Sequence, residues 1–158
     1  MNVSIRAAGH KDAEIVAEMV GELLAEIMNT IGEQAFHFDY RETRERAERY
    51  LDNGTYSVFI ASESSKNLDI GFAALSESHA LYAEGKFGII PEFYVRPEFR
   101  SKGVGRMLMD VVKKCGISKG WKRLEVATPP EPAYDRTLKF YEANGFRSTK
   151  GRKLKVIL

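Results

Sequence analysis

The spacing of apolar and polar positions along the chain predicts a mixture of helices and strands. From residue 12 to about residue 31, apolar side chains recur every three or four positions, which is typical of a helix with one buried face. A second, highly charged helix is expected from about residue 40 to residue 51, between Asp39 and Gly54. Two further helices are expected over 104–118 and 137–143. Alternating or β-branched segments predict strands at 3–7, 56–62, 68–76, 87–95 and 123–128, with a final hairpin over 146–158.

This order of elements indicates an α/β fold with a mixed sheet. Pro91 lies inside the strand over 87–95. Because a proline has no N–H to donate to a neighbouring strand, we expect the strand to bulge or splay at this point.

Length and composition bound the class of protein. With 158 residues, of which 44% are hydrophobic, the chain is long enough for one globular domain and short for two. No apolar run approaches the roughly 20 residues that span a bilayer, so we expect a cytoplasmic protein with no membrane partner. Cys115 is the single cysteine and the three histidines lie far apart, so neither a disulfide nor a metal site is expected.

The charge is unevenly distributed along the chain. Residues 1–53 carry six basic and eleven acidic side chains, whereas residues 96–158 carry sixteen basic and six acidic ones. This asymmetry fits an anionic ligand held by the C-terminal half and a cationic ligand drawn to the N-terminal half, and it fits an uneven solvated surface equally well. Four glutamates at i+4 spacing line one face of the first helix and repel one another. Full solvation or a nearby cation is needed to offset this repulsion. The four residues are Glu14, Glu18, Glu22 and Glu26.

A glycine-containing loop follows the strand that Pro91 interrupts and opens the helix over 104–118. Gly103 and Gly105 let a ligand approach the backbone, and the free N–H groups of a helix start favour phosphate oxygens. Three basic side chains surround the loop, namely Arg100, Lys102 and Arg106. The segment contains neither a G-x-G-x-x-G pattern nor a Walker loop, so it gives poor support for a dinucleotide or nucleoside triphosphate site.

Three linked features resemble the GCN5-related N-acetyltransferase (GNAT) superfamily. They are the strand Ile90-Pro91-Glu92-Phe93-Tyr94-Val95, the loop Arg100-Ser101-Lys102-Gly103-Val104-Gly105 and the later segment Phe140-Tyr141-Glu142-Ala143-Asn144-Gly145-Phe146. The resemblance covers most of the chain. It implies one domain over residues 1–158 with the GNAT fold, a mostly antiparallel twisted sheet that is splayed at a bulged central strand and flanked by about four helices.

The stretch from residue 71 to residue 95 is most similar to the small-amine branch of the superfamily, which includes the spermidine/spermine acetyltransferases. Two positions depart from the pattern. Pro91 stands where the polyamine branch has the first of two consecutive acids, and Tyr134 stands where the superfamily often has Asn.

The resemblance also implies that acetyl-CoA is the acetyl donor. The amides from Ser101 to Arg106 would hold its pyrophosphate, and main-chain groups of Phe93 and Val95 would pair with its pantetheine arm. An N–H at the bulge would polarise the thioester carbonyl and stabilise the charge that develops there. The expected donor-binding residues are Phe93, Tyr94, Val95, Arg100, Ser101, Lys102, Gly103, Val104, Gly105, Arg106 and Arg136.

Two residues are candidates for proton transfer. Tyr141 matches the tyrosine of the superfamily that acts as general acid, and it would protonate the departing thiolate; the alternative is a tyrosine packed in the core. Tyrosine and an alkyl thiol both have an ordinary pKa of about 10 or slightly below, so this transfer is energetically reasonable. Glu92 is the candidate base or proton relay, because an ammonium must lose a proton before its nitrogen attacks. The alternative for Glu92 is a carboxylate that only binds the amine or faces solvent.

The acceptor amine is expected beside the first two helices and the loop that joins them. Carboxylates there would attract an amine cation by roughly 1 kcal/mol per exposed pair. The alternative for each carboxylate is a solvated acidic surface. The candidates are Glu22, Glu26, Glu33, Asp39, Tyr40 and, before the bulged strand, Tyr82.

The first hypothesis is therefore an acetyl-CoA-dependent N-acetyltransferase that acts on a primary amine of a small molecule. Direct attack in a ternary complex is expected, since Cys115 lies away from the expected reaction centre. A protein or peptide amine is the second hypothesis, and a non-catalytic acyl-CoA-binding regulatory module is the third. Nucleic acid is not an expected partner, because no recognised binding motif accompanies the basic half. A homodimer could form by pairing of residues 154–158 across subunits.

Overall fold

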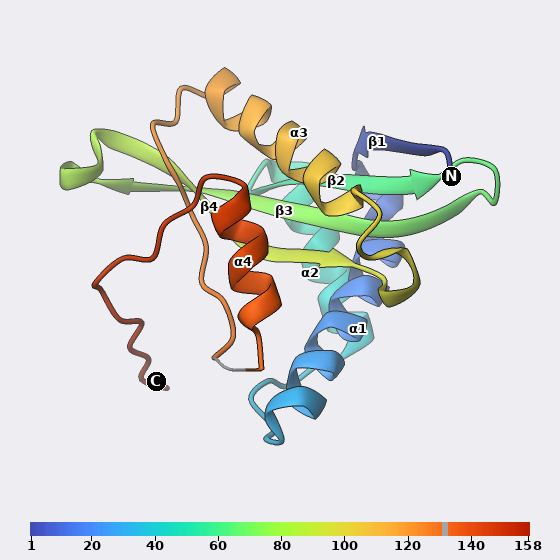
Figure 1. The fold of residues 1–158 in the computed structure, drawn as a ribbon, viewed down its shortest axis with the longest axis horizontal. Helices are drawn as coiled ribbons and strands as arrows, with labels where there is room; N and C mark the ends of the chain where they lie inside the picture. The colour runs from blue at the N-terminus through green and yellow to red at the C-terminus, as the bar shows by residue number, and fades with distance from the viewer. Residues whose placement is uncertain (131–132) are drawn as a thin grey trace. The chain divides into compact units, whose positions relative to one another are not determined.

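A computed structural model describes residues 1–130 and 133–158 of the protein (Figure 1). The chain divides into two compact units, Met1–Val126 and Ala127–Leu158, and each is described by itself. The first unit contains both helices and strands, as the predicted α/β fold requires. Its elements are β1 (Val3–Ala7), α1 (Ala13–Ile31), α2 (Tyr40–Asn53), β2 (Tyr56–Glu63), β3 (Leu68–Ala80), β4 (Gly85–Val95), α3 (Val104–Ser118) and β5 (Leu124–Glu125).

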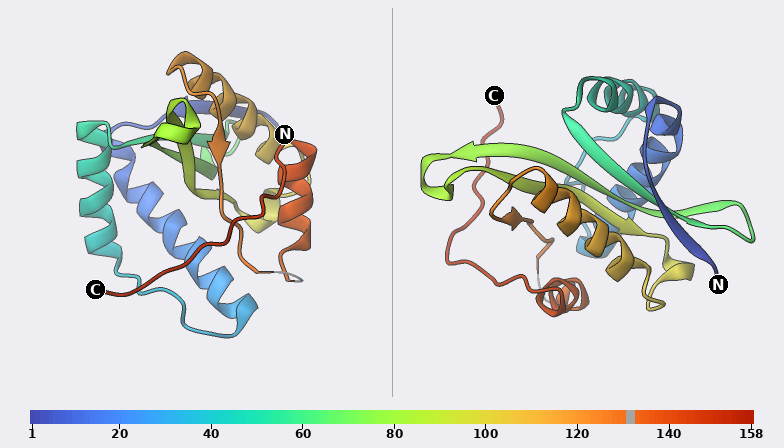
Figure 2. Two further views of the ribbon diagram at one scale, coloured as in Figure 1. Left: turned by 90° about the vertical axis from the view of Figure 1, so that its left-hand side faces the viewer. Right: turned by 90° about the horizontal axis from the view of Figure 1, so that it is seen from above.

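The five strands form one mixed sheet in the order β1-β2-β3-β4-β5. The first four pair antiparallel with their sequence neighbours, and β5 runs parallel to β4. Helices α1 and α2 cover one face of this sheet, and α3 covers the other (Figure 2). The prediction of a mixed, mostly antiparallel sheet is therefore confirmed.

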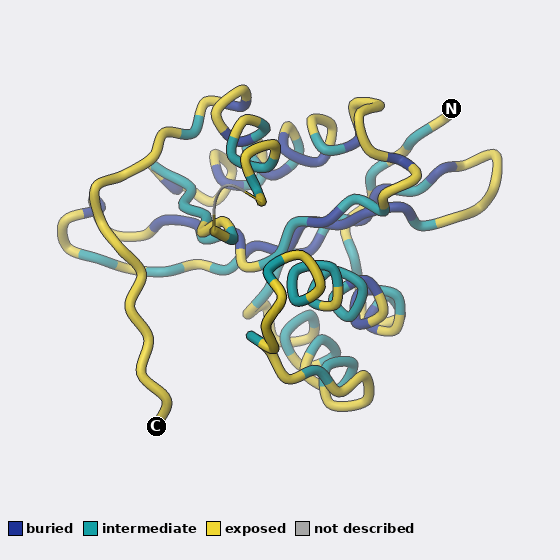
Figure 3. Tube along the Cα trace, turned by 60° about the horizontal axis from the view of Figure 1, so that its bottom comes forward, coloured by how far each residue is buried: buried dark blue, intermediate teal, exposed yellow. Residues whose placement is uncertain are grey.

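The core between α1 and the sheet follows the two periodicities of the sequence. Residues two apart on a strand share a face, and the buried positions that face α1 are Val58, Ile60, Phe72, Ala74 and Tyr94. Val16 and Met19 of α1 pack against them. Burial of a large apolar side chain stabilises the fold by about 1.5–3 kcal/mol, so this layer fixes α1 on the sheet. Buried positions occur along β2, β3 and β4 in the middle of the sheet, and the longest uninterrupted buried run is residues 70–75 of β3 (Figure 3).

The opposite face packs against α3. Four residues of the helix at i, i+4, i+5 and i+8 spacing are almost fully buried there: Val104, Leu108, Met109 and Val112. This spacing places them on one side of the helix and leaves its polar side chains in solvent.

The bulge that Pro91 predicts is present in β4. Ala74 pairs with Glu92 and Ser76 pairs with Ile89, so Leu75 of β3 lies opposite two residues of β4. One extra residue reverses the faces to which the following side chains point. The parallel pairing with β5 involves only Gly88 and Ile89, so it ends before the bulge and the strands part there.

The reversal of faces is visible in the contacts on either side of the bulge. Before it, Gly88 lies directly against the Trp121 ring, and a Cβ at position 88 would stand only 2.7 Å from Leu124. After it, Glu92 and Tyr94 reach the opposite face, where α1 and α2 lie. The bulge therefore determines that Glu92 is on the α1 and α2 side of the sheet.

The second unit contains one helix, α4 (Asp135–Ala143), within its described residues. The helix begins two residues before the predicted start, and β5 is shorter than the predicted strand over 123–128. The hairpin predicted over 146–158 is wrong, because the structure places no strand in that segment. Strands require a hydrogen-bonded partner, and the large apolar side chains at its end are instead exposed: Leu154, Val156, Ile157 and Leu158. Among the helices of the described chain, none has the length and apolar character to cross a membrane.

Candidate functional site

The carboxyl of Glu92 is held in a largely buried position next to Tyr56. The Tyr56 hydroxyl donates to Glu92 Oε2 at 3.2 Å. Burial raises the pKa of Glu92 to about 6, and the hydrogen bond from Tyr56 acts in the opposite direction. A carboxyl with such a pKa is deprotonated at neutral pH and is a stronger base than a solvated one, which suits proton transfer.

Tyr94 and Arg96, which both follow the bulge, bind one carboxylate of α1. The Tyr94 hydroxyl and Arg96 Nε each donate to Glu22 Oε1 at 3.1 Å, and Arg96 Nη2 donates to Oε2 at 2.8 Å. Arg96 Nη1 also donates to the carbonyl of Asp69 at 3.0 Å. Burial and the neighbouring Glu22 raise the pKa of Tyr94, so its hydroxyl stays protonated and acts as a donor.

A second arginine repeats this arrangement one turn further along α1. Arg100 Nη1 and Nη2 donate to the two oxygens of Glu26 at 2.8 and 2.7 Å. Its Nε donates to the carbonyl of Val95 at 2.7 Å. For Glu22 and Glu26, the cation that offsets repulsion along α1 is therefore an arginine of the same chain.

The loop between β4 and α3 presents an open helix start. Ser101 and Gly103 adopt left-handed conformations with φ of 60° and 85°. The first turn of α3 has no acidic residue. Within residues 1–130 and 133–158, no side chain caps α3 at Gly103, and a Cβ on Gly103 would meet no atom within 4 Å. The first N–H groups of an α-helix have no partner within the helix and attract anions. The exposed side chains of Lys102 and Arg106 add positive charge beside them.

The remaining residues predicted to bind the amine are not brought together. Asp39 caps α2 by accepting from the Glu42 N–H at 2.8 Å, and Glu33 and Tyr40 lie exposed on either side of it. Tyr82 stands at the exposed tip of the β3–β4 hairpin, beyond Gly85. Glu92 lies seven positions after Gly85 along β4, which at 3.3 Å per residue of strand is roughly 20 Å. Tyr82 and Glu92 therefore do not share one pocket.

Tyr141 and Arg136 belong to α4 in the second unit. Tyr141 is buried, and its ring meets those of Phe140 and Phe146 edge-on with centroids 5.3 and 5.4 Å apart. Burial raises the pKa of Tyr141, so its hydroxyl is protonated at neutral pH. Arg136 is exposed. In the same unit, the Tyr134 hydroxyl is buried and finds no hydrogen-bond partner among the described residues.

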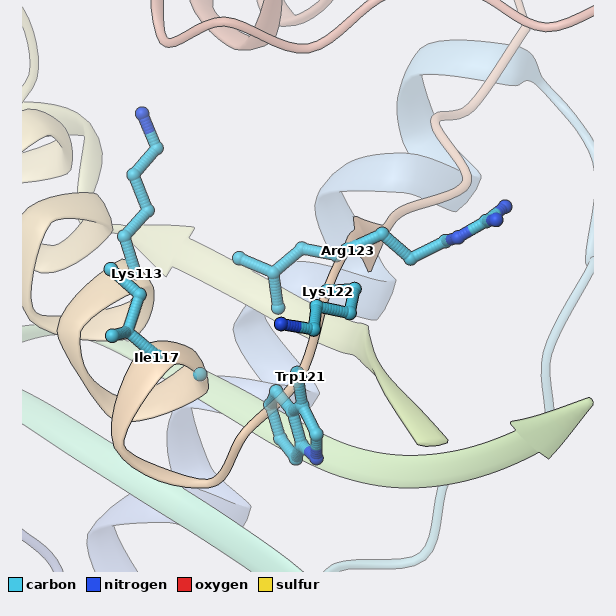
Figure 4. Close-up of a pocket in the computed structure, with 7 residues that line it drawn as sticks. Lys113, Ile117, Trp121, Lys122 and Arg123 are labelled. Atoms are coloured by element: carbon cyan, nitrogen blue, oxygen red, sulfur yellow. The ribbon is translucent and has the colours of Figure 1, made fainter. Parts of the chain in front are cut away.

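A hollow of about 200 Å³ lies near the C-terminal end of α3 (Figure 4). Its lining includes Ile117 and Trp121, with Lys113, Lys122 and Arg123 around it. No residue that the sequence predicts for the site lines it. Because α3 has 15 residues and rises about 1.5 Å per residue, the hollow is roughly 20 Å from the open start of the helix.

A family profile described as "Acetyltransferase (GNAT) domain" matches residues 54–148, which is more than half of the chain. The chain belongs to the GNAT family. It is therefore an N-acetyltransferase. The match includes β4 with its bulge, the loop before α3 and the segment around Tyr141, which are the features on which the resemblance was predicted.

Solved structures of GNAT proteins share this fold over nearly the whole chain. AAC(6')-Iy, in complex with the bisubstrate analogue CoA-S-monomethyl-acetylneamine, is 22% identical and superposes with a TM-score of 0.80 over 100% of this chain and 99% of that one. A predicted acetyltransferase with acetyl-CoA from Clostridium acetobutylicum is 19% identical, with a TM-score of 0.76 over 98% and 96% of the two chains.

A ribosomal-protein-alanine N-acetyltransferase from Brucella melitensis biovar Abortus 2308 is 18% identical, with a TM-score of 0.73 over 99% of each chain. The comparison with curated proteins finds no match. At these identities the similarity establishes the GNAT fold and not the substrate.

Sequence reasoning missed two residues that contact the predicted site of this GNAT protein. Tyr56 binds Glu92 and Arg96 binds Glu22, across 36 and 74 positions of the sequence. Alternation along β2 and β4 indicates which side chains share a face, but the register between strands is needed to show which of them meet. Only the requirement for a cation beside the glutamates of α1 could have pointed to Arg96.

Replacement of Arg96 by lysine tests the connection between β4 and α1. Lysine cannot form the two parallel hydrogen bonds that the guanidinium makes to Glu22 while also reaching Asp69, so we expect unfolding to become easier by about 1–2 kcal/mol. Urea unfolding measures this change. Arg41→Lys is the matched control, because Arg41 makes an exposed pair with Glu45 on α2 and should alter stability by less than about 0.5 kcal/mol. Equal effects of the two substitutions would contradict a special role for Arg96.

Proposed function

We propose that this GNAT protein transfers the acetyl group of acetyl-CoA to a primary amine of a small molecule, by direct attack of the amine nitrogen. Residues 1–158 act together as one catalytic domain in this proposal. The observation that carries it is Glu92, a mostly buried carboxyl immediately after the bulge with a pKa raised to about 6. Coenzyme binding alone would not require such a group, whereas deprotonation of an ammonium does.

The loop before α3 fits the phosphate groups of coenzyme A. Its amides from Ser101 to Arg106 are uncapped, and the space in front of Gly103 is open. Lys102 and Arg106 supply charge next to these amides, while Phe93, Tyr94 and Val95 offer the edge of β4 beyond the end of β5 to the pantetheine arm. Bound acetyl-CoA supplies the activated acetyl thioester.

The second unit contributes three further groups to the proposal. Tyr141, kept protonated by burial, donates its proton to the sulfur of the leaving group. Arg136 and the Tyr134 hydroxyl, which is buried without a partner among the described residues, provide donors for the coenzyme. A buried hydroxyl in that state costs about 1–3 kcal/mol and gains from a ligand acceptor.

The acceptor side rests on fewer residues than the sequence suggested. An amine would have to displace arginines from Glu22 and Glu26. The more accessible candidates are therefore Glu33 and Tyr40, which are exposed near the connection between α1 and α2. The AAC(6')-Iy name, with its acetylneamine analogue, favours a small amine, and the Brucella protein's name points to a protein amine. A small-amine acceptor of the spermidine/spermine type is the finer form of this proposal. Pairing of residues 154–158 in a dimer and a cytoplasmic location stay predictions.

Release of free thiol from acetyl-CoA by the purified protein tests the reaction directly. We expect turnover with at least one member of a panel of polyamines, aminoglycosides and amino acids. Turnover only with short peptides would replace the small-molecule acceptor by a protein amine. If no member of the panel supports thiol release but acetyl-CoA still raises the melting temperature, the protein is instead an acyl-CoA-binding module.

Substitution of Tyr141 by phenylalanine tests the general acid. Removal of one positioned proton donor should lower kcat by about 10²-fold or more, while the dissociation constant for acetyl-CoA changes little. Steady-state kinetics and calorimetric titration measure the two quantities. An unchanged kcat would remove Tyr141 from this role.

Substitution of Gly103 by aspartate tests the phosphate-binding loop. A carboxylate in front of the helix start would repel phosphate, and the left-handed backbone there disfavours any side chain, so coenzyme A should bind at least tenfold more weakly. Gly32→Asp is the matched control, because Gly32 is also left-handed with open space around it but lies at the end of α1. Equal affinities of the two variants for coenzyme A would contradict the placement of the loop.

A further inference from the structure

The hydrogen bond between Tyr56 and Glu92 makes the two oxygens of the carboxylate different. Oε2 accepts from the Tyr56 hydroxyl at 3.2 Å, whereas Oε1 has no hydrogen-bond or ion-pair partner in the described part of the chain. Tyr56 stands at the first position of β2, and Glu92 stands on β4, with β3 between them. The contact therefore depends on the register of three strands and on the bulge that turns Glu92 to this face.

We propose that Tyr56 is a positioning residue, which holds Oε2 of Glu92 so that Oε1 is directed to accept the proton of the acceptor ammonium. The inference rests on the proposed function, since it concerns the base of that reaction. In the step itself, an N–H bond of the ammonium breaks and an O–H bond forms on Oε1, while the nitrogen keeps the electron pair with which it attacks. Glu92 later returns its proton to water, so the carboxylate is regenerated.

The position of the Tyr56 hydroxyl is supported by its surroundings. The ring of Tyr50 on α2 lies with its centroid 5.0 Å from that of Tyr56 at an angle of 48°, which restrains the Tyr56 ring on the outer side. Burial and the carboxylate of Glu92 raise the pKa of Tyr56, so the hydroxyl stays protonated and can only donate to Glu92.

Few charged groups influence this pair. Tyr50 and Arg46 of α2 act on Tyr56, with opposite effects on its pKa. From β3, the residue paired with Glu92 is Ala74 and the next one on that face is Ser76, neither of which is charged. No ion pair to Glu92 is formed by any residue that the structure describes. A change in the protonation of Glu92 on removal of the Tyr56 hydroxyl can thus be assigned to that hydroxyl.

The pH dependence of kcat/KM tests the proposal, because a merely structural role would not move it. Glu92 acts only when deprotonated, so activity should fall as the pH drops through its pKa of about 6. Tyr56→Phe removes a hydrogen bond that stabilises the carboxylate, and this acid limb should move up by about one pH unit. Tyr50→Phe is the matched control, since it removes a neighbouring phenol oxygen without a bond to Glu92, and its acid limb should stay in place.

Glu92→Gln separates failure of this inference from failure of the proposed function. If the limb disappears in Glu92→Gln but does not move in Tyr56→Phe, Glu92 is the base and the role of Tyr56 is overturned. If Glu92→Gln retains both its activity and its limb, Glu92 is not the base, and both the proposed base and the inference fail.

A second test requires no turnover, so it can be made without knowing the acceptor. The carbon-13 shift of the Glu92 carboxyl, assigned by its absence in Glu92→Gln, is followed by NMR against pH. A titration that moves to higher pH in Tyr56→Phe and not in Tyr50→Phe supports the inference. Coincident titrations in the wild type and Tyr56→Phe overturn it.

Discussion

The bulge at Pro91 is the constraint on which the site depends. Proline cannot donate a ladder hydrogen bond, and the extra residue it brings shifts the register of β4 against β3 by one position. Since side chains alternate across a sheet, this single shift exchanges the two faces for every residue that follows. It places Glu92 beside Tyr56 and Tyr94 beside Glu22, and it coincides with the end of pairing between β4 and β5. Fold and chemistry are thus linked through one backbone irregularity.

The charges on α1 illustrate why composition alone leaves a function open. Four glutamates at i+4 spacing suggested either solvent or a cationic ligand. Three of them are instead paired with arginines that follow β4 and precede α3. Glu18 and Glu22 pair with Arg96, and Glu26 pairs with Arg100. The acidic and basic halves of the sequence therefore partly neutralise each other inside the first unit. An excess of acidic residues in the sequence therefore does not by itself indicate a site for a cationic ligand.

Much of the fold could be predicted from the sequence because its signals are local. The helix over 104–118 and the bulge at Pro91 follow from apolar spacing and from one residue type, and both are present as predicted. The hairpin over 146–158 was wrong because alternation describes a strand's faces and not whether a partner strand is available. The role of Tyr56 could not be predicted for a related reason. Its hydrogen bond with Glu92 depends on the register of three strands, and no local sequence pattern specifies that register.

The two arginine bridges also have a consequence for how this scaffold can vary. They attach α1 to the end of β4 at Glu22 and Glu26, before the helix ends at Ile31. Phe38 attaches the far side of the connection by packing on Gly21. Between these anchors lie residues 32–37, which are exposed except for the half-buried Ala35. The sequence of such a segment can therefore change without loss of the contacts that hold α1 on the sheet.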